Sequence, residues 1–215
     1  MSAAEDIVRG PEPSVIACWS CRGPTPAAEP FCPTCGAVQP PGQADHFRRL
    51  GLPRSFAIDT AEVEGRYFQL QRRLHPDRFA TKGSRERALS QSQASSLNAA
   101  YETLMDPVRR AGYLLRLQGI EVDAGDGKTI DDRELLMEAM EMREALAEAA
   151  DAAAVEDALA RTQAAVGACR DRLAVAFAAA DRALAHRLTL RLKYLSKLQE
   201  ETEQRRLRFF AAKAG

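Results

Sequence analysis

The sequence lacks any long hydrophobic run. Its longest uninterrupted apolar stretch, Leu173 to Ala180, is far shorter than the roughly 20 residues that a membrane-spanning helix requires. The start of the chain carries Glu5 and Asp6 and has neither a basic flank nor an apolar core, so we expect neither a secretory signal nor an arginine-rich transit peptide. We therefore expect no membrane partner and a cytoplasmic location, where cysteine thiols stay reduced.

The sequence also lacks net charge, internal repeats and the alternation typical of strands. Its 30 Lys and Arg residues balance 30 Asp and Glu residues, whereas a protein whose whole surface binds nucleic acid would be basic. Hydrophobic residues make up 46% and charged residues 28% of the chain. These values are ordinary for globular proteins, so they exclude wholesale disorder and a fibrous fold.

Changes in composition divide the chain into parts. Proline and cysteine are concentrated before residue 45, and the remainder is rich in Ala, Leu, Arg and Glu, which favours helices. We predict a mainly α protein made of a flexible N-terminus (1–13), a four-cysteine module (14–38), a linker (39–44), a helical hairpin unit (45–118), a connecting loop (119–130) and a C-terminal three-helix bundle (131–215).

The four-cysteine module predicts a metal site. Its ligands would be two Cys-x-x-Cys pairs, Cys18 with Cys21 and Cys32 with Cys35. The two-residue gap lets both thiolates of a pair reach one cation, and Gly36 can adopt the positive φ that turns backbone N–H groups toward sulfur. Four thiolates complete the tetrahedral shell of Zn²⁺ without an open position, so we predict a structural zinc site. Because so short a segment buries little surface, the metal would supply its folding free energy.

Two other interpretations of this module stay open. The cysteines could form two disulfides or a redox pair, which a cytoplasmic location disfavours. A zinc ribbon could also bind nucleic acid. However, residues 14–38 contain a single basic residue, Arg22, which disfavours binding to phosphates. We expect Trp19 and Phe31 to cover the module rather than to stack on bases.

The next segment predicts two antiparallel helices. Asp59 is a suitable N-cap for the first helix, and Pro76 must end it because the residue before proline is disfavoured in helical geometry. The second helix is expected to begin at Ser84 and to end at Asp106-Pro107. The expected buried stripes are Val63, Tyr67, Leu70 and Leu74 on the first helix, and Ala88, Leu97, Ala100, Tyr101 and Leu104 on the second.

The turn between these helices carries His75-Pro76-Asp77 beside a basic helix face. Between Arg66 and Lys82 there are five basic residues and one acid. A positive helix that ends in a rigid turn suits docking to an acidic partner. No nucleophile, oxyanion donor or second carboxylate lies nearby in the sequence, and an exposed tip cannot exclude water, so we predict no catalysis there.

The C-terminal segment predicts three helices, at about 131–150, 151–180 and 182–213. The first is acidic and the last is basic, and oppositely charged helices can lie side by side in one bundle. The expected core stripes are Leu135, Ala139, Met142 and Leu146 on the first helix, and Leu184, Leu188, Leu195 and Leu198 on the last.

Several apolar residues fall outside these stripes. They are Leu136, Met137 and Met140, bordered by Glu141 and Glu144, and on the last helix Leu190 and Tyr194. Exposed Leu, Met and Tyr with an acidic rim are typical of a protein-binding patch. Periodicity alone favours a second interpretation equally: these residues could instead be buried under the hairpin unit or in a dimer interface.

The hairpin unit resembles a J-domain. The resemblance depends on His75-Pro76-Asp77 and on the later pattern Leu97-Asn98-x-Ala100-Tyr101-x-x-Leu104-x-Asp106-Pro107. J-domains dock on a DnaK-type ATPase chaperone and stimulate its ATP hydrolysis. The resemblance implies that Asp77 pairs with an arginine of the chaperone and that His75 and Pro76 fix the turn. It also implies that basic residues around the turn contact the chaperone, namely Arg66, Arg72, Arg73 and Arg78.

About residues 45–212 resemble the HscB family, in which a J-domain precedes a helical bundle. The similarity lies in Phe47-x-x-Leu50-Gly51-Leu52-Pro53, Tyr113-Leu114-Leu115, and the segments 136–144 and 192–198. HscB proteins deliver the iron–sulfur scaffold protein IscU to HscA, a specialised DnaK-type chaperone. The resemblance implies scaffold contacts at Leu136, Met137, Met140, Glu141, Glu144 and Tyr194. The four-cysteine extension is similar to the form known from eukaryotic relatives.

These observations predict a zinc-bearing co-chaperone that is not itself an enzyme. Its expected partners are a DnaK/HscA-type chaperone and an IscU-type scaffold, without nucleic acid or membrane. A general J-domain co-chaperone with another client is one alternative, which a pull-down lacking the scaffold would favour. A zinc-ribbon nucleic-acid-binding protein is the other, which salt-sensitive DNA or RNA binding would support.

Overall fold

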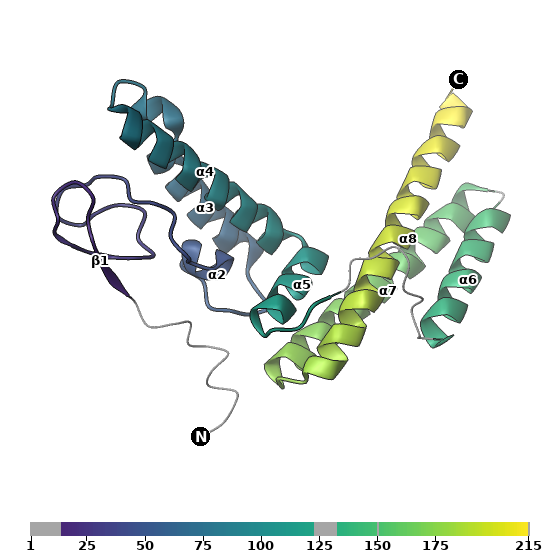
Figure 1. Cartoon of the computed structure of the whole chain (residues 1–215). Coiled ribbons are helices and arrows are strands. Elements are labelled where there is room, and N and C mark those ends of the chain that lie inside the picture. Colours follow the sequence, from purple (N-terminus) through teal and green to yellow (C-terminus); the bar gives the residue numbers. More distant parts are fainter. Residues whose placement is uncertain (1–13, 123–132, 150, 215) are drawn as a thin grey trace. The chain divides into compact units, whose positions relative to one another are not determined.

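Helices dominate the structure, a computed structural model that describes residues 14–122, 133–149 and 151–214. The chain forms two compact units, Met1–Arg110 and Ala111–Gly215 (Figure 1). The predicted mainly α fold class is confirmed. The predicted flexible N-terminus (1–13) and residues 123–130 of the predicted connecting loop lie outside the described residues.

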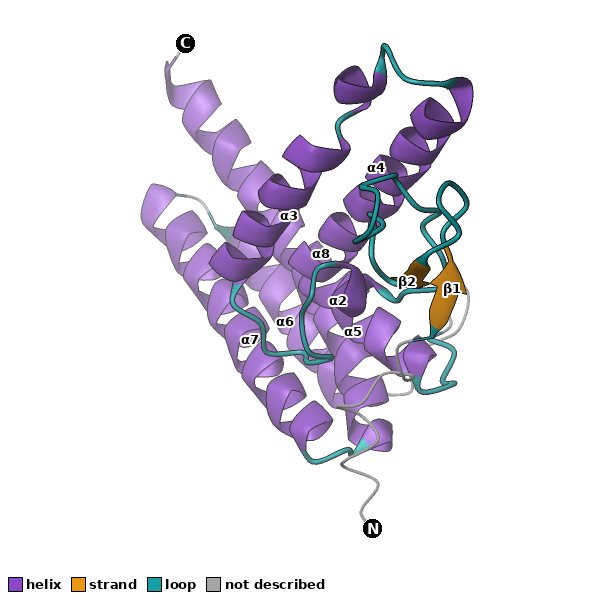
Figure 2. Cartoon of the chain, turned by 90° about the vertical axis from the view of Figure 1, so that its left-hand side faces the viewer, coloured by secondary structure: helices purple, strands orange, loops and turns teal. Residues whose placement is uncertain are grey.

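The four-cysteine module contains a small antiparallel sheet (Figure 2). Its strands are β1 (Val15–Ala17) and β2 (Pro24–Pro26), and they pair with Val15 opposite Pro26. The sequence shows no convincing run of residues for these strands. Each strand has only three residues, and β2 contains two prolines, so neither shows the alternating pattern by which strands are recognised.

The hairpin unit consists of α2 (His46–Arg49), α3 (Thr60–Leu74), the 3-10 turn η1 (Pro76–Phe79) and α4 (Ser84–Met105). The Asp59 carboxylate accepts hydrogen bonds from the first backbone N–H groups of α3, as its N-cap role requires. The predicted helix start at Ser84 and helix end before Asp106 are confirmed. α3 and α4 pack against each other, and their buried apolar residues are Val63, Leu74, Leu97, Ala100 and Leu104.

Four positions on the predicted stripes of this hairpin are not buried. Tyr67, Leu70 and Tyr101 are half-buried, and Ala88 is exposed. Tyr67 and Tyr101 stack on each other with ring centroids 4.1 Å apart, and the hydroxyl of Tyr67 donates to Asn98 at 3.1 Å. Each ring therefore packs on one face while its polar end stays at the surface.

Three polar residues of α4, Ser90, Gln93 and Thr103, are buried although the apolar pattern does not include them. The Ser90 hydroxyl donates to the Leu74 carbonyl at 2.7 Å, and Gln93 Nε2 donates to the Gln39 carbonyl at 2.9 Å. Each hydrogen bond offsets the cost of burying its polar group. Hydrophobic periodicity cannot reveal such partners, because they depend on contacts between distant segments.

Helix α5 (Pro107–Leu117) follows α4 without a loop, where the sequence predicts only a helix end. The Asp106 carboxylate accepts hydrogen bonds from the backbone N–H groups of Val108 and Arg109 at 2.8 and 3.0 Å. Pro107 has no N–H to satisfy and is favourable in the first turn of a helix. Asp106-Pro107 therefore ends one helix and begins the next.

The second unit contains α6 (Arg133–Glu148), α7 (Ala152–Ala178) and α8 (Arg182–Ala214), which form the predicted three-helix bundle. Leu188, Leu195 and Leu198 of α8 are buried as predicted, whereas Leu184 is half-buried and Leu192 is buried in addition. On α6, Leu146 is buried and Met142 is half-buried. The predicted core side chains of Leu135 and Ala139 lie outside the described residues.

Ion pairs join the acidic α6 to the basic α8. Arg143 of α6 lies 3.3 Å from Glu201 of α8, and Arg191 of α8 pairs with Glu138 of α6. The Arg191–Glu138 pair joins a base of α8 to an acid of α6, as the sequence suggests, whereas the Arg143–Glu201 pair runs in the opposite sense. None of the described helices is both long enough and apolar enough to cross a membrane.

Candidate functional site

The His75-Pro76-Asp77 turn lies at the tip of the α3–α4 hairpin, and all three residues are exposed. His75 Nδ1 accepts a hydrogen bond from the Asp77 backbone N–H at 3.3 Å, and it lies 3.5 Å from the Asp77 carboxylate. Pro76 occupies the start of η1, where a backbone N–H is not needed. The imidazole thus caps the turn, and the Asp77 side chain remains 88% exposed to solvent.

Buried residues on both sides of the turn hold it in place. Leu74 and Phe79 are only 2% and 9% exposed. Because α3 ends at Leu74, the carbonyl of this residue lacks a donor within its own helix, and the buried Ser90 hydroxyl supplies one. An unpaired buried acceptor costs about 1–3 kcal/mol. The turn is therefore anchored from within while its charged end faces outward.

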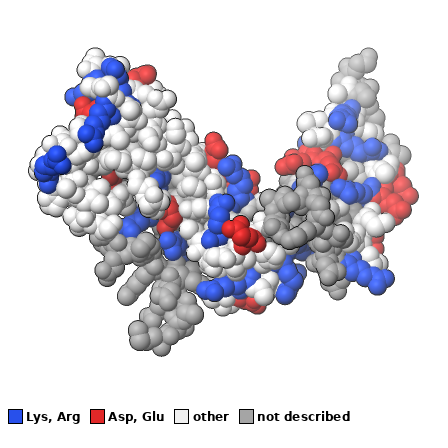
Figure 3. Space-filling model, in the orientation of Figure 1, with Lys and Arg blue, Asp and Glu red and all other residues white. Residues whose placement is uncertain are grey.

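Two of the basic residues that the resemblance assigns to chaperone contacts are open to solvent. Arg72 and Arg78 are exposed, and neither forms an ion pair with a described residue. Figure 3 shows Lys and Arg side chains gathered at the upper end of the first unit, where the hairpin tip lies. A partner with a negative surface would meet this positive charge beside the Asp77 carboxylate.

The other two assigned arginines also interact within the first unit. Arg66 pairs with Glu62 at 2.7 Å and donates to the Leu50 and Gly51 carbonyls. The Arg73 guanidinium lies 4.5 Å from the centroid of the Phe31 ring. Part of the positive charge predicted for the face of α3 is therefore already engaged by the fold.

The four predicted metal ligands come together. The sulfur atoms of Cys18, Cys21, Cys32 and Cys35 all lie within 4.8 Å of one another. Cys18 and Cys35 have their sulfurs 3.8 Å apart, and Cys21 and Cys32 have theirs 3.7 Å apart. Four sulfurs at about 2.3 Å from one Zn²⁺ would be about 3.8 Å apart, whereas a disulfide requires about 2.0 Å. The cluster therefore fits a single tetrahedral ion and does not fit two disulfides.

Donor groups around the cluster suit negatively charged sulfur. The backbone N–H groups of Ser20 and Gly23 donate to the sulfurs of Cys18 and Cys21 at 3.3 and 3.4 Å. Gln39 Nε2 donates to Cys18 at 3.3 Å. Such bonds stabilise thiolates and orient them toward a cation. The four cysteines could thus hold a metal ion.

The environment of Cys32 favours its thiolate form. The buried Thr25 hydroxyl, which has no oxygen or nitrogen partner among the described residues, has the largest influence on this thiol. Together with the backbone N–H groups of Cys35 and Thr34, and against burial, it lowers the pKa of Cys32 to about 5. The shift is not shared by the whole cluster: against the hydrogen bond from the Gly23 backbone N–H, the neighbouring Cys35 side chain and burial raise the pKa of Cys21 to about 11. The cluster therefore loses its first proton at Cys32, and a bound cation would favour the thiolate form of the others.

The four-cysteine module packs on the hairpin through two aromatic residues beside its ligands. Trp19, next to Cys18, lies under the Arg85 guanidinium of α4 at 4.5 Å, and its Nε1 donates to the Val38 carbonyl. Phe31, next to Cys32, lies under Arg73 of α3 in the same way. Each contact is a cation–π interaction. Both rings cover the module, as predicted, and they also attach it to the hairpin.

The predicted linker strengthens this attachment. Arg49 Nη2 of α2 donates to the carbonyls of Pro41 and Ala44 at 2.9 and 3.3 Å, and the Gln39 carbonyl accepts from Gln93. The sequence alone does not reveal these contacts. A proline-rich segment between two units is typical of a linker, and only the folded chain shows which carbonyls the arginine reaches.

The apolar residues outside the core stripe of α6 are exposed. Met140 is 70%, Met137 55% and Leu136 37% exposed, and Glu141 and Glu144 are exposed beside them. Tyr194 of α8 is half-buried, with its ring 5.3 Å from the Arg143 guanidinium of α6. These residues form a surface patch across α6 and α8, here called the α6–α8 patch: Leu136, Met137, Met140, Glu141, Glu144 and Tyr194.

Comparisons with known families match both helical parts of the chain. The family model described as the DnaJ domain matches residues 45–113. The model described as the HSCB C-terminal oligomerisation domain matches residues 131–203. The first match includes the exposed turn, and the second includes the α6–α8 patch.

Curated relatives match most of the chain. The chain is 36% identical over 194 residues to the human iron–sulfur cluster co-chaperone protein HscB, covering 88% of this chain and 82% of the relative. It is 37% identical to a co-chaperone protein HscB homolog of Aeromonas salmonicida, covering 74% of this chain and 95% of the relative. The crystal structure of human HscB superposes with a TM-score of 0.80 at 37% identity, covering 87% and 96% of the two chains. The Jac1 co-chaperone of Saccharomyces cerevisiae superposes with a TM-score of 0.57 at 26% identity, covering 70% and 86%.

Proposed function

Because the chain belongs to the HscB family of iron–sulfur cluster co-chaperones, we propose that it delivers an IscU-type scaffold protein to a DnaK/HscA-type ATPase chaperone. In this proposal His75-Pro76-Asp77 and the basic residues around it, Arg66, Arg72, Arg73 and Arg78, contact the chaperone and stimulate its ATP hydrolysis. The α6–α8 patch binds the scaffold. The chain tethers two partners and performs no bond chemistry itself.

The observation that carries this proposal is the anchored but exposed turn. Leu74, Phe79 and Ser90 fix its base, while the Asp77 carboxylate faces solvent beside exposed arginines. A rigid charged group loses little conformational entropy when a partner binds it. Charge at the rim also raises the rate of encounter with a partner of opposite sign. The exposed turn lacks the water exclusion and the nucleophile that catalysis by the chain itself would need.

The direct test is steady-state ATP hydrolysis by a purified HscA/DnaK-type chaperone. We expect the rate to rise when the full chain is added and to rise further when an IscU-type scaffold is added with it. The scaffold without this protein is the control. An unchanged rate with both proteins present, at concentrations that saturate binding of the scaffold, would contradict the proposal.

We further propose that the four cysteines hold a structural Zn²⁺. The four free thiols and the donors to sulfur support this ion. When bound, the ion would supply folding free energy to the module. Because four thiolates fill its coordination shell, no position would be left open for a substrate. The Gln39 side chain and the backbone N–H groups of Ser20 and Gly23 orient the sulfurs of Cys18 and Cys21.

Removing the metal with a chelator should release the module and leave the helices intact. Trp19 is the single tryptophan and packs beneath Arg85, so its fluorescence should shift to the red as it becomes solvated. Far-ultraviolet circular dichroism of the helices should hardly change.

Cys32→Ser should lower bound zinc well below one equivalent, whereas Cys169→Ser, which changes the cysteine outside the cluster, should retain it. A metal-free chain with unchanged Trp19 emission would refute the structural role of the ion.

A further inference from the structure

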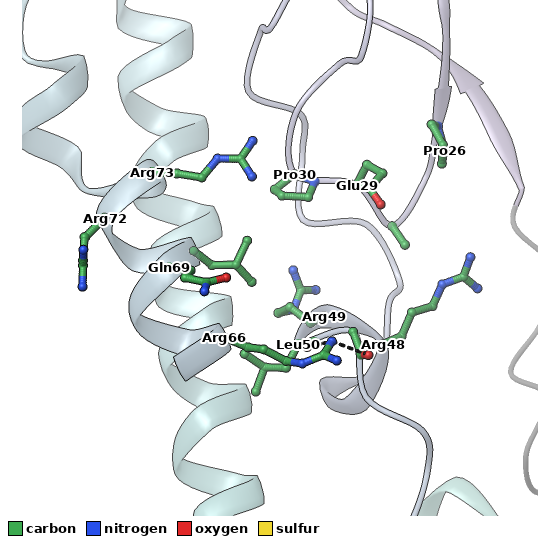
Figure 4. A pocket seen from close by; sticks show the side chains of 13 residues that line it. Pro26, Glu29, Pro30, Arg48, Arg49, Leu50, Arg66, Gln69, Arg72 and Arg73 are labelled. Carbon is green, nitrogen blue, oxygen red and sulfur yellow. Dashed lines mark hydrogen bonds between the residues drawn. The ribbon is translucent and has the colours of Figure 1, made fainter. Parts of the chain in front are cut away.

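A cavity of about 810 Å³ lies inside the first unit, between the four-cysteine module and the hairpin. The loop that carries Glu29 and Pro30 forms one wall, and α2 and α3 form the other (Figure 4). The volume falls within the roughly 300–1,000 Å³ that is typical of small-molecule sites. Arg66, Arg72 and Arg73 also belong to the proposed chaperone-docking surface, whereas Arg48 and Arg49 of α2 and the loop of the four-cysteine module do not.

The cavity is rich in positive charge. Five arginines line it, against a single carboxylate, that of Glu29; they are Arg48, Arg49, Arg66, Arg72 and Arg73. Figure 4 shows the side chains of Arg49, Arg66 and Arg73 extending into the space between α3 and the opposite loop, while Arg72 points away from it. Concave walls of low polarity focus the field of such charges and attract anions.

Neighbouring groups fix the orientation of these guanidinium groups. Arg49 donates to the Pro41 and Ala44 carbonyls, and Arg66 Nη1 donates to the Gly51 carbonyl at 2.6 Å. Arg73 stacks on Phe31. Arg66 uses all three of its nitrogens, in bonds to Glu62, Leu50 and Gly51, so it contributes positive charge rather than a free pair of donors. The Arg73 guanidinium makes no hydrogen bond to a described residue. Held on Phe31, it loses less side-chain entropy when a ligand binds, and it can bind phosphate or carboxylate through two hydrogen bonds at once.

The charge of the cavity is only partly offset by the protein. Glu62 pairs with Arg66, but no carboxylate among the described residues pairs with Arg73. Like charges brought together repel one another, so a bound anion would stabilise the arrangement. Apolar contacts are also available, because Pro26, Leu50 and Leu70 line the same space. We propose that this cavity binds a small organic anion that carries two or more phosphate or carboxylate groups.

Isothermal titration calorimetry of the full chain at low ionic strength tests the proposal, with inorganic pyrophosphate and citrate as separate probes. We expect saturable binding of one equivalent of at least one probe. Pyrophosphate alone would assign phosphate chemistry, and citrate alone would assign carboxylate chemistry. Arg73→Gln should weaken binding about 10-fold or more, which is the loss of roughly one charge-assisted contact.

Arg85→Gln is the matched control, because it removes the same charge and the same kind of cation–π contact with the module but lies outside the cavity. It should change the dissociation constant less than twofold. Glu29→Gln should have the opposite effect and tighten binding about threefold, since it removes the one competing carboxylate. Absence of saturable binding for both probes would overturn the proposal. Equal losses for Arg73→Gln and Arg85→Gln would also overturn it, because they indicate general attraction to exposed arginines rather than binding in the cavity. So would unchanged affinity in Glu29→Gln, because a ligand in the cavity would feel the removal of this charge.

Discussion

Asp77→Ala is expected to abolish stimulation of the chaperone ATPase while leaving affinity for the scaffold unchanged. In the proposed complex Asp77 pairs with an arginine of the chaperone, and removing one partner of such a pair costs about 2–5 kcal/mol. Stimulated hydrolysis should therefore fall more than 10-fold, to the basal rate of the chaperone. The α6–α8 patch belongs to the other compact unit, so scaffold binding should not change.

The fold itself should tolerate this substitution. Because the Asp77 side chain is 88% exposed, its removal should alter the free energy of unfolding by less than about 0.5 kcal/mol. Glu102→Ala, which removes an exposed acid of α4 from the same unit, is the matched control and should retain full stimulation. Loss of ATPase stimulation together with loss of scaffold affinity would contradict the proposed separation of the two surfaces.

The helices around the docking turn could be predicted because their ends are determined locally. Asp59 caps α3, Pro76 interrupts it, and Asp106-Pro107 ends α4. The same local chemistry at Asp106 also starts α5, a signal that is present in the sequence but is ambiguous, since Asp-Pro is equally typical of a helix end. Local capping therefore predicts where a helix ends better than it predicts whether a loop or a new helix comes next.

Contacts between distant segments could not be predicted. Gln93 reaches the carbonyl of Gln39, 54 residues away, and Arg73 and Arg85 lie over Phe31 and Trp19. The pattern of cysteines predicts which sulfurs meet, because a tetrahedral ion constrains them strongly. Arginines and aromatic rings carry no such constraint, so the docking of the module and the arginine-lined cavity become visible only in the fold.

Replacing both Met137 and Tyr194 with alanine is expected to weaken binding of the scaffold about 10- to 100-fold, because large apolar and aromatic side chains carry most of the energy of a protein interface. Periodicity leaves open whether these residues belong to a core or to a binding surface. In the structure Met137 is 55% exposed and Tyr194 is half-buried beneath Arg143. Surface plasmon resonance with an immobilised IscU-type scaffold would measure the change, and ATPase stimulation without the scaffold should be retained.

Stability measurements separate a binding role from a packing role for the same residues. Met137→Ala alone should change the free energy of unfolding in urea by less than about 0.5 kcal/mol if the side chain is at the surface, whereas a core methionine would cost about 2–5 kcal/mol. Leu207→Ala is the matched control, because Leu207 is 67% exposed on α8 outside the patch and should leave scaffold affinity unchanged. A large loss of stability in Met137→Ala, or equal losses of affinity in Leu207→Ala and the double variant, would assign the α6–α8 patch to packing or to nonspecific adhesion. Preserved stability of Met137→Ala together with reduced scaffold affinity of the double variant would show that the lost affinity does not come from a damaged core. The methionine and the tyrosine would then contact the scaffold or orient the residues that do.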